Sequence, residues 1–274
     1  MTILFYDLET TGTDPQTCGI HQISGAFLVD GVVRDQFNYH VKPREDCECQ
    51  PVAMQMAGHT YEEMMASEEY LPMDVVFDKV FSKIIEYDGG IVKDGRPDYD
   101  RRIFLGGYNV HKFDNEFLRR WFLDNKAPYA LGMYVAEAVD VMLLAVPALM
   151  RFRSQLPGFT QEEIAWALGI ELDPEKLHDA NYDILVCIEI YKALVGERCV
   201  GALRRERWND LHTQYDIRDF KQRMIAKRKE KKRLAAEIEL QALKQEFSDK
   251  LQERRAAAAG DTGDENHEGL SAMD

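Results

Sequence analysis

The segment that decides the fold is Ile3-Leu4-Phe5-Tyr6-Asp7-Leu8-Glu9-Thr10-Thr11-Gly12, in a chain of 274 residues. Its four leading apolar residues predict a buried strand, and the Thr-Thr-Gly that follows predicts its end. Residues i and i+2 of a strand point to the same face, so Asp7 and Glu9 project together while Leu8 packs on the other side. Because neighbouring carboxylates repel each other, a divalent cation between them explains the pair, and oxygen ligands favour Mg²⁺ or Mn²⁺. Ordinary surface strands also carry such pairs, so the pair alone leaves both interpretations open.

Strands and helices alternate after this segment. Strands over 20–29 and 32–41 are joined at Asp30-Gly31, a dipeptide typical of a tight hairpin turn. Thr160 and Glu163 have the spacing of a capping box, which predicts the start of a helix. The other expected elements are a loop or small hairpin over 89–102, strands over 103–105 and near 137–141, and helices over 74–87, 114–125, 141–153 and 181–195. Three early strands followed by this alternation indicate an α/β domain with a mixed sheet over residues 1–198.

The composition changes beyond residue 198. Residues 217–255 contain neither Gly nor Pro and predict one long helix within a helical extension over 199–255. This extension is basic from about 218, with 13 Lys and Arg against 7 Asp and Glu over 218–255. Its apolar positions keep no clean heptad, so a coiled coil stays an open alternative. The basic run 227–233 is either a solvated helix face or a surface for nucleic acid or a protein partner. Residues 256–274 form an acidic tail that we expect to be disordered.

Charge and composition limit the class of protein. The chain carries a net charge of −14, yet bound divalent cations would reverse the field around clustered carboxylates, so a nucleic-acid enzyme is not excluded. No run approaches the roughly 18 apolar residues of a membrane span, and the N-terminal residues lack the basic region of a signal peptide. The five cysteines form no paired framework, which fits a reducing compartment. We therefore expect a cytoplasmic protein without a membrane partner.

Two further motifs carry acids that could share a site with Asp7. The first is Gly106-Gly107-Tyr108-Asn109-Val110-His111-Lys112-Phe113-Asp114, where a strand turns into a helix that begins at Asp114. The second is His178-Asp179-Ala180-Asn181-Tyr182-Asp183, where a histidine precedes a helix and an aspartate lies in its first turns. Taken singly, Asp114 fits an acid at a helix N-terminus, and the second motif fits a capping aspartate beside a loop histidine.

Together the three motifs resemble the DEDD superfamily of 3′→5′ exonucleases, also called DnaQ-like or RNase T-like, over residues 1–198. The matching patterns are D-x-E-T-T-G in the first strand, N-x-x-x-F-D at a helix start and H-x-A-x-x-D at the last helix. The string from Gly107 to Glu116 is most similar to the exonuclease I branch, which acts on single-stranded DNA. A histidine five residues before the last aspartate marks the DEDDh subtype, and His178 has this position. In the family, the aspartate at Asp140 packs or caps a helix and binds no metal.

This resemblance implies an RNase H-like fold and a two-metal hydrolysis of phosphodiesters. The family's ligands to two Mg²⁺ or Mn²⁺ ions correspond to Asp7, Glu9, Asp114 and Asp183, and its general base corresponds to His178. The positions beside the terminal nucleotide are Leu8 and Thr10, and the floor of its pocket is formed by Asn109 and Phe113.

Three functions follow as hypotheses. The first is a free-standing 3′→5′ exonuclease that releases nucleoside monophosphates from single-stranded DNA, as in DNA repair or replication. The second is an exoribonuclease, or a proofreading subunit that docks in trans to a DNA polymerase through residues 200–255. The third is an inactive module that binds nucleic acid or a protein partner. DNA is favoured over RNA through the exonuclease I motif, although the contacts to the 2′ position that distinguish the two sugars are not visible in motifs.

Overall fold

The computed structural model describes residues 1–88, 92–93, 96–176, 179–196 and 205–260. The chain divides into two compact units, Met1–Lys227 and Arg228–Asp274. His178 and residues 261–274 therefore lie outside the described residues, whereas residues 256–260, expected to belong to the disordered tail, are helical.

The first unit is built on a six-stranded mixed sheet in the order β4-β3-β2-β1-β7-β8. Its strands are β1 (Thr2–Thr10), β2 (Ile20–Val29), β3 (Val32–Val41), β4 (Tyr70–Leu71), β7 (Ile103–Gly107) and β8 (Val135–Asp140). β1 pairs antiparallel with β2 and parallel with β7, which in turn pairs parallel with β8. The carboxyl ends of β1, β7 and β8 consequently lie along the same edge of the sheet. The predicted mixed α/β sheet is confirmed.

The hairpin between β2 and β3 forms where the sequence predicts it. Asp30 and Gly31 both have positive φ angles, 50° and 81°, as a primed two-residue turn requires. Val29 faces Val32 across this turn.

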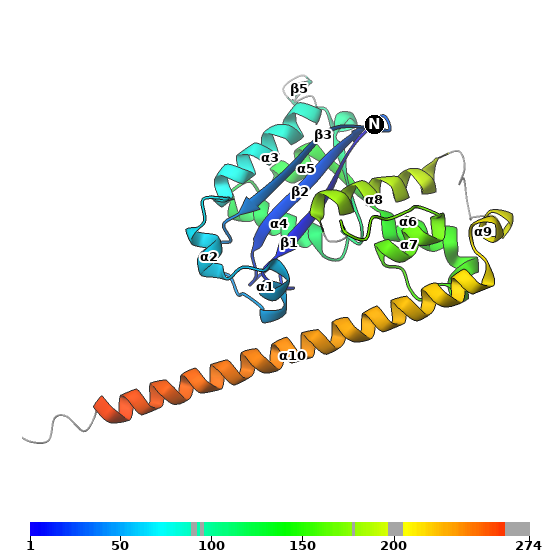
Figure 1. The fold of residues 1–274 in the computed structure, drawn as a ribbon. Helices are drawn as coiled ribbons and strands as arrows, with labels where there is room; N and C mark the ends of the chain where they lie inside the picture. Colours follow the sequence, from blue (N-terminus) through cyan, green and yellow to red (C-terminus); the bar gives the residue numbers. More distant parts are fainter. Residues whose placement is uncertain (89–91, 94–95, 177–178, 197–204, 261–274) are drawn as a thin grey trace, which may run out of the picture. The chain divides into compact units, whose positions relative to one another are not determined.

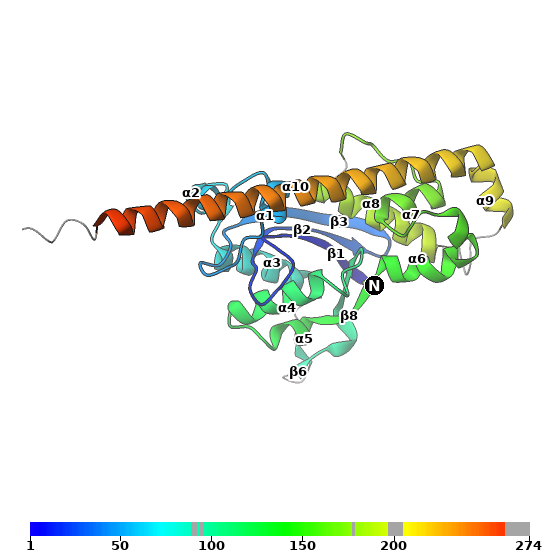
Figure 2. The same cartoon turned by 90° about the horizontal axis from the view of Figure 1, so that it is seen from below.

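Helices cover both faces of the sheet (Figures 1 and 2). One face packs against α3 (Met73–Asp88), α4 (Asp114–Asp124) and α5 (Ala130–Tyr134), and the other against α6 (Val141–Leu149), α7 (Gln161–Leu168) and α8 (Ala180–Val195). The side chains of β1 alternate between the two cores: Ile3 and Phe5 enter one, and Leu4, Tyr6 and Leu8 enter the other.

Smaller elements connect these layers. They are α1 (Pro51–Ala57), α2 (Tyr61–Ala66), the strand pair β5 (Val92–Lys93) and β6 (Arg96–Pro97), and the 3₁₀ turns η1 (Tyr99–Arg101) and η2 (Met150–Gln155). The small hairpin expected within 89–102 is thus present. The helix expected to reach residue 153 is α-helical only to Leu149 and continues as the 3₁₀ turn η2, after Pro147 has removed one backbone donor.

The C-terminal region comprises α9 (Arg205–Leu211) and the long helix α10 (Gln214–Gly260). The appended long helix is confirmed, and α9 lies within the helical extension predicted over 199–255 as a separate short helix. Trp208 is fully buried and stacks on Phe152 with ring centroids 4.3 Å apart, and Phe220 of α10 stacks on Trp166 at 4.1 Å. The first compact unit therefore includes α9 and the first turns of α10, whereas an exonuclease domain ending at 198 stays a prediction. Among the described helices, none is long and apolar enough to cross a bilayer.

Candidate active site

Three elements bring acidic side chains to the carboxyl edge of the central strands. Asp7 and Glu9 lie on β1, Asp114 is the first residue of α4, and Asp183 lies in the first turn of α8. Asp114 is almost fully buried, and its Oδ1 accepts a hydrogen bond of 3.2 Å from the backbone N–H of Leu8. This bond places the carboxylate of Asp114 directly beside the segment between Asp7 and Glu9.

The acids act on one another electrostatically. Burial raises the pKa of Asp7 well above its ordinary value, and the negative charges of Asp114, Glu9 and Asp183 raise it further. Burial likewise raises the pKa of Asp114 to about 7, against the lowering effect of backbone hydrogen bonds from its own N–H and that of Leu8. The negative charges of the cluster therefore act against the ionisation of Asp7.

The donor set fits hard divalent cations, because all four side chains offer carboxylate oxygens. Within the ranges that the structure describes, however, no three His, Cys, Asp or Glu side chains form a ready-made metal centre. The described cysteines and histidines, Cys47, Cys49, His40 and His59 among them, form no such group either. The four acids thus influence one another electrostatically, but their carboxylates do not surround a common point as metal ligands would.

Asp140 shapes the loop that leads to Asp114. Its carboxylate accepts from the N–H groups of Met142 and Leu143, at 3.0 and 3.3 Å, and so caps α6. It also accepts from the N–H groups of Asn109 and His111, each at 3.1 Å. Asp140 is therefore a capping and loop-holding residue, in agreement with the prediction from sequence.

The turn before this loop is unusually close to β1. A side chain at Gly107 would lie 2.9 Å from the carbonyl oxygen of Tyr6, so this position accepts only glycine without rearrangement. Asn109 has a φ of 62°, a left-handed conformation that asparagine adopts more readily than most residues. Both features direct the chain from β7 back toward the acids of β1.

A buried hydrogen bond that the sequence did not predict fixes the start of α4. The hydroxyl of Tyr6 donates to Oδ1 of Asn115 at 2.7 Å. Tyr6 directly precedes Asp7 and Asn115 directly follows Asp114, so this bond ties together the two segments that carry the acids. On α8, Nε2 of Gln161 donates to the backbone carbonyl of Asp183 at 2.7 Å and holds its first turn.

The structure also locates the residues predicted to meet substrate. Leu8 and Thr10 are buried, and the Thr10 hydroxyl donates to the carbonyl of Gly12 at 2.7 Å. Asn109 and Phe113 are partly buried, and the Phe113 ring packs on Phe117 with centroids 5.0 Å apart. Their contacts with a nucleotide stay predictions. His178 lies outside the described residues, next to the segment in which Asp179 caps α8 by accepting from the N–H of Tyr182.

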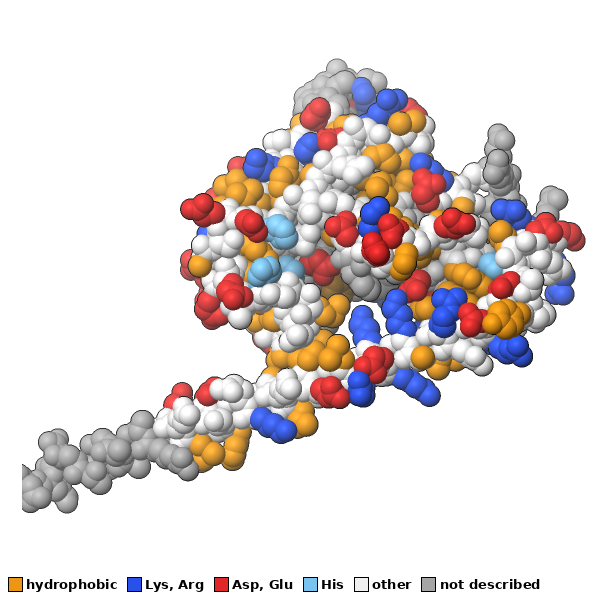
Figure 3. Space-filling model, in the orientation of Figure 1, with side chains coloured by type: hydrophobic (Ala, Val, Ile, Leu, Met, Phe, Trp, Pro, Cys, Tyr) orange, Lys and Arg blue, Asp and Glu red, His pale blue; other side chains and the backbone are white. Residues whose placement is uncertain are grey.

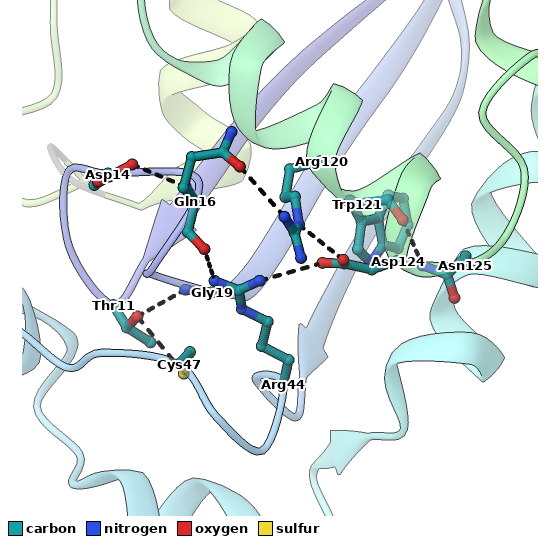
Figure 4. A network of polar contacts seen from close by, with 10 residues as sticks. All are labelled: Thr11, Asp14, Gln16, Gly19, Arg44, Cys47, Arg120, Trp121, Asp124 and Asn125. Atoms are coloured by element: carbon teal, nitrogen blue, oxygen red, sulfur yellow. Dashed lines mark hydrogen bonds and ion pairs between the residues drawn. The ribbon is translucent and has the colours of Figure 1, made fainter.

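A polar network anchors the loop that follows β1 (Figure 4). Arg120 bonds Asp124 at 2.8 Å and the side-chain oxygen of Gln16 at 3.3 Å. Arg44 donates to the backbone carbonyl of Gln16 and lies 3.9 Å from Asp124. Thr11 accepts from the N–H of Gly19 at 2.9 Å and closes the loop at its base. The segment immediately after Glu9 and Thr10 is therefore held to the far end of α4.

A mixed sheet of this topology, with acids at the end of its central strand, is the RNase H-like fold of the DnaQ-like exonucleases. The solved structures confirm this resemblance. E. coli exonuclease I in complex with a dA16 oligonucleotide is 25% identical and superposes with a TM-score of 0.55 over 76% of this chain and 42% of that chain. Exonuclease I from Methylocaldum szegediense shares the fold at 21% identity and a TM-score of 0.55, again over 76% and 42% of the two chains.

A curated relative is the PolC-type DNA polymerase III of Mycoplasmopsis pulmonis, which is 24% identical over 186 residues. The match covers 68% of this chain and 11% of the polymerase. The chain thus spans less than half the length of the exonuclease I structures and a small part of the polymerase. No family model matches the sequence.

Proposed function

We propose that this protein is a metal-dependent 3′→5′ exonuclease of the DEDDh type that releases nucleoside monophosphates from single-stranded DNA. The observation that supports the proposal is the electrostatic influence of Glu9, Asp114 and Asp183 on the buried Asp7, at the carboxyl edge of an exonuclease I-like sheet. Single-stranded DNA is the favoured substrate because exonuclease I structures of this fold are complexes with dT13 and dA16 oligonucleotides.

The four carboxylates would hold two Mg²⁺ or Mn²⁺ ions, which when bound supply an activated water and neutralise charge on the scissile phosphate. Hydrogen bonds within the chain hold the proposed ligands in position. The Leu8 N–H orients the carboxylate of Asp114, and the bond from Tyr6 to Asn115 sets the start of α4 against β1. Burial, together with the negative charge of neighbouring acids, raises the pKa of Asp7 and Asp114, and a bound cation would offset both effects.

His178 would act as the general base. Its imidazole would accept the proton of the attacking water, and the phosphodiester bond to the 3′-oxygen of the penultimate nucleotide would break. Leu8 and Thr10 would lie beside the terminal nucleotide, over a floor formed by Asn109 and Phe113. Hydrolysis then shortens the strand by one nucleotide from its 3′ end.

A second candidate is a trans-acting proofreading subunit of a DNA polymerase, which the match to a PolC-type polymerase favours. The chemistry would be the same, and residues 200–255 would dock to the polymerase. Preference for a mismatched 3′ end on a primer–template, over the same single strand, would distinguish this function from free-standing degradation.

The test is degradation of matched DNA and RNA oligonucleotides in Mg²⁺ or Mn²⁺. A 5′-labelled DNA strand should give a descending ladder, and a 3′-labelled strand should release its label at once as a mononucleotide. EDTA should stop both reactions. Faster cleavage of RNA would make the protein an exoribonuclease, and label leaving from the 5′ end first would contradict the proposal.

A further inference from the structure

A row of uncharged polar side chains continues from the acids across the sheet. In the register of the strands, Ser24 of β2 lies opposite Asp7, and Asn38 of β3 lies opposite Ser24. Two residues along β1, Gln22 lies opposite Glu9. Directly paired residues of antiparallel strands point to the same face, so these side chains share the face of the acids. Asn38 is two strand spacings, about 10 Å, away from Asp7.

Two hydrogen bonds fix the orientation of the Asn38 amide. Its Oδ1 accepts from the hydroxyl of Ser24 and from Nε2 of Gln22, each at 2.9 Å. Ser24 is fully buried, whereas Asn38 is exposed. Because both bonds go to the oxygen, the Nδ2 group points away from them, and it has no hydrogen-bond partner among the residues that the structure describes. Its two N–H groups are therefore available to a ligand on the face of the acids.

The surroundings of Asn38 suit a polyanion. On the same face β3 also presents Gln36 and His40, since every second residue of a strand points the same way. None of these side chains is acidic, although the chain holds 48 Asp and Glu against 34 Lys and Arg. Figure 3 shows white surface, the colour of uncharged side chains and backbone, over β2 and β3. Asparagine is a common donor to phosphate oxygens, which carboxylates would repel.

We propose that the Asn38 amide binds a phosphate oxygen of the DNA strand a few nucleotides from its 3′ end, with Ser24 and Gln22 holding the amide in place. The inference rests on the proposed function, because the acids define where the 3′ end lies. Asn38 is uncharged, so its contact with phosphate displaces no counterions. It touches no reacting atom, so it acts on substrate affinity and not on the chemical step.

The experiment is fluorescence anisotropy of a 5′-fluorescein oligothymidylate with the full-length protein in EDTA, which stops metal-dependent cleavage. Asn38→Asp should raise the dissociation constant at least about tenfold, because a negative charge replaces the two donors. This variant keeps an oxygen that accepts from Ser24 and Gln22, so its midpoint of urea denaturation should stay unchanged. Gln36→Glu is the matched control. It adds the same charge at an exposed residue on the same strand and face, two residues away, and should have a much smaller effect.

Salt dependence and steady-state kinetics separate a phosphate contact from other roles. Asn38→Ala should weaken binding without changing the slope of the logarithm of the dissociation constant against that of salt concentration. In Mg²⁺ it should raise KM and leave kcat unchanged. Equal effects of Asn38→Asp and Gln36→Glu, or unaltered binding by Asn38→Asp, would overturn the proposal. Binding that depends on Asn38 without any release of mononucleotides would overturn the proposed function alone, and no binding by the unaltered protein would overturn both.

Discussion

The two ends of α4 hold aspartates in opposite electrostatic settings. At its start, Asp114 lies among Asp7, Glu9 and Asp183, and its pKa is raised to about 7. At its end, Asp124 lies between Arg120 and Arg44, at 2.8 and 3.9 Å. Paired carboxylates stabilise a fold, whereas crowded carboxylates cost stability and persist where a function needs them. On the proposed function, the first end of the helix would serve catalysis, whereas the second end anchors the loop after β1.

Removing an acid from each end should have opposite consequences. Asp7→Ala should lower the rate of mononucleotide release by several orders of magnitude, because it removes a proposed metal ligand, and it should leave stability unchanged or improved. Asp124→Ala should retain most activity per folded molecule but lose about 1–3 kcal/mol of stability, since two partly buried arginines lose their partner. Initial rates measure the activity of both variants, and urea denaturation measures their stability. Asp78→Ala, at an exposed aspartate, is the matched control.

If Asp124→Ala abolished activity in a folded protein while Asp7→Ala did not, the assignment of the two ends would be reversed.

His178→Ala should slow the reaction by about 10²–10⁴-fold, the usual contribution of a general base. Raising the pH should partly restore this variant, because hydroxide replaces the missing base. The pH profile of initial rates checks it, and a variant whose profile matched that of the unaltered protein would exclude His178 as the base.

Stability of the metal-free protein should fall as the pH rises between about 4 and 7. Because the folded pKa of Asp114 is raised to about 7, the folded state binds more protons than the unfolded state in this range. The loss is about 1.4 kcal/mol per pH unit for one proton, and Asp7 adds to it in the same direction. Denaturation in EDTA at several pH values measures the slope, which Asp114→Asn should reduce. Stability that rose with pH over this window would contradict the raised pKa.

Tyr6→Phe tests the buried hydrogen bond that holds the start of α4 against β1. It leaves Oδ1 of Asn115 buried without its donor and should cost about 1–3 kcal/mol. The midpoint of denaturation should fall while its slope stays constant. Tyr129→Phe, at a residue that is 83% exposed, is the matched control and should change neither.

Features set by neighbouring residues were predictable from the sequence. The alternation of Asp7, Leu8 and Glu9, the turn at Asp30-Gly31 and the capping box of Thr160 with Glu163 each depend on a few consecutive residues, and all three are present in the structure. The paired Asp124 was not predictable in this way, because Arg44 reaches it from a loop eighty residues earlier in the chain.

The hydrogen bonds that hold the site were not predictable either, because they also join residues far apart in the chain. The bond from Tyr6 to Asn115 joins residues 109 positions apart, and that from Leu8 to Asp114 joins residues 106 positions apart. Neither leaves a local pattern, since each depends on β1 and β7 lying side by side in the sheet. The motif residues could be named from the sequence, whereas the contacts that hold them could not.

The central claim is that the crowded acids at the start of α4 form the cation site of a nuclease. Calorimetric titration of the metal-free protein with Mn²⁺ tests it most directly, with Asp7→Ala and Asp124→Ala titrated in parallel. The unaltered protein and Asp124→Ala should take up Mn²⁺ alike, and Asp7→Ala should bind it much more weakly. Mn²⁺ binding by Asp7→Ala as tight as that of the unaltered protein would contradict the account.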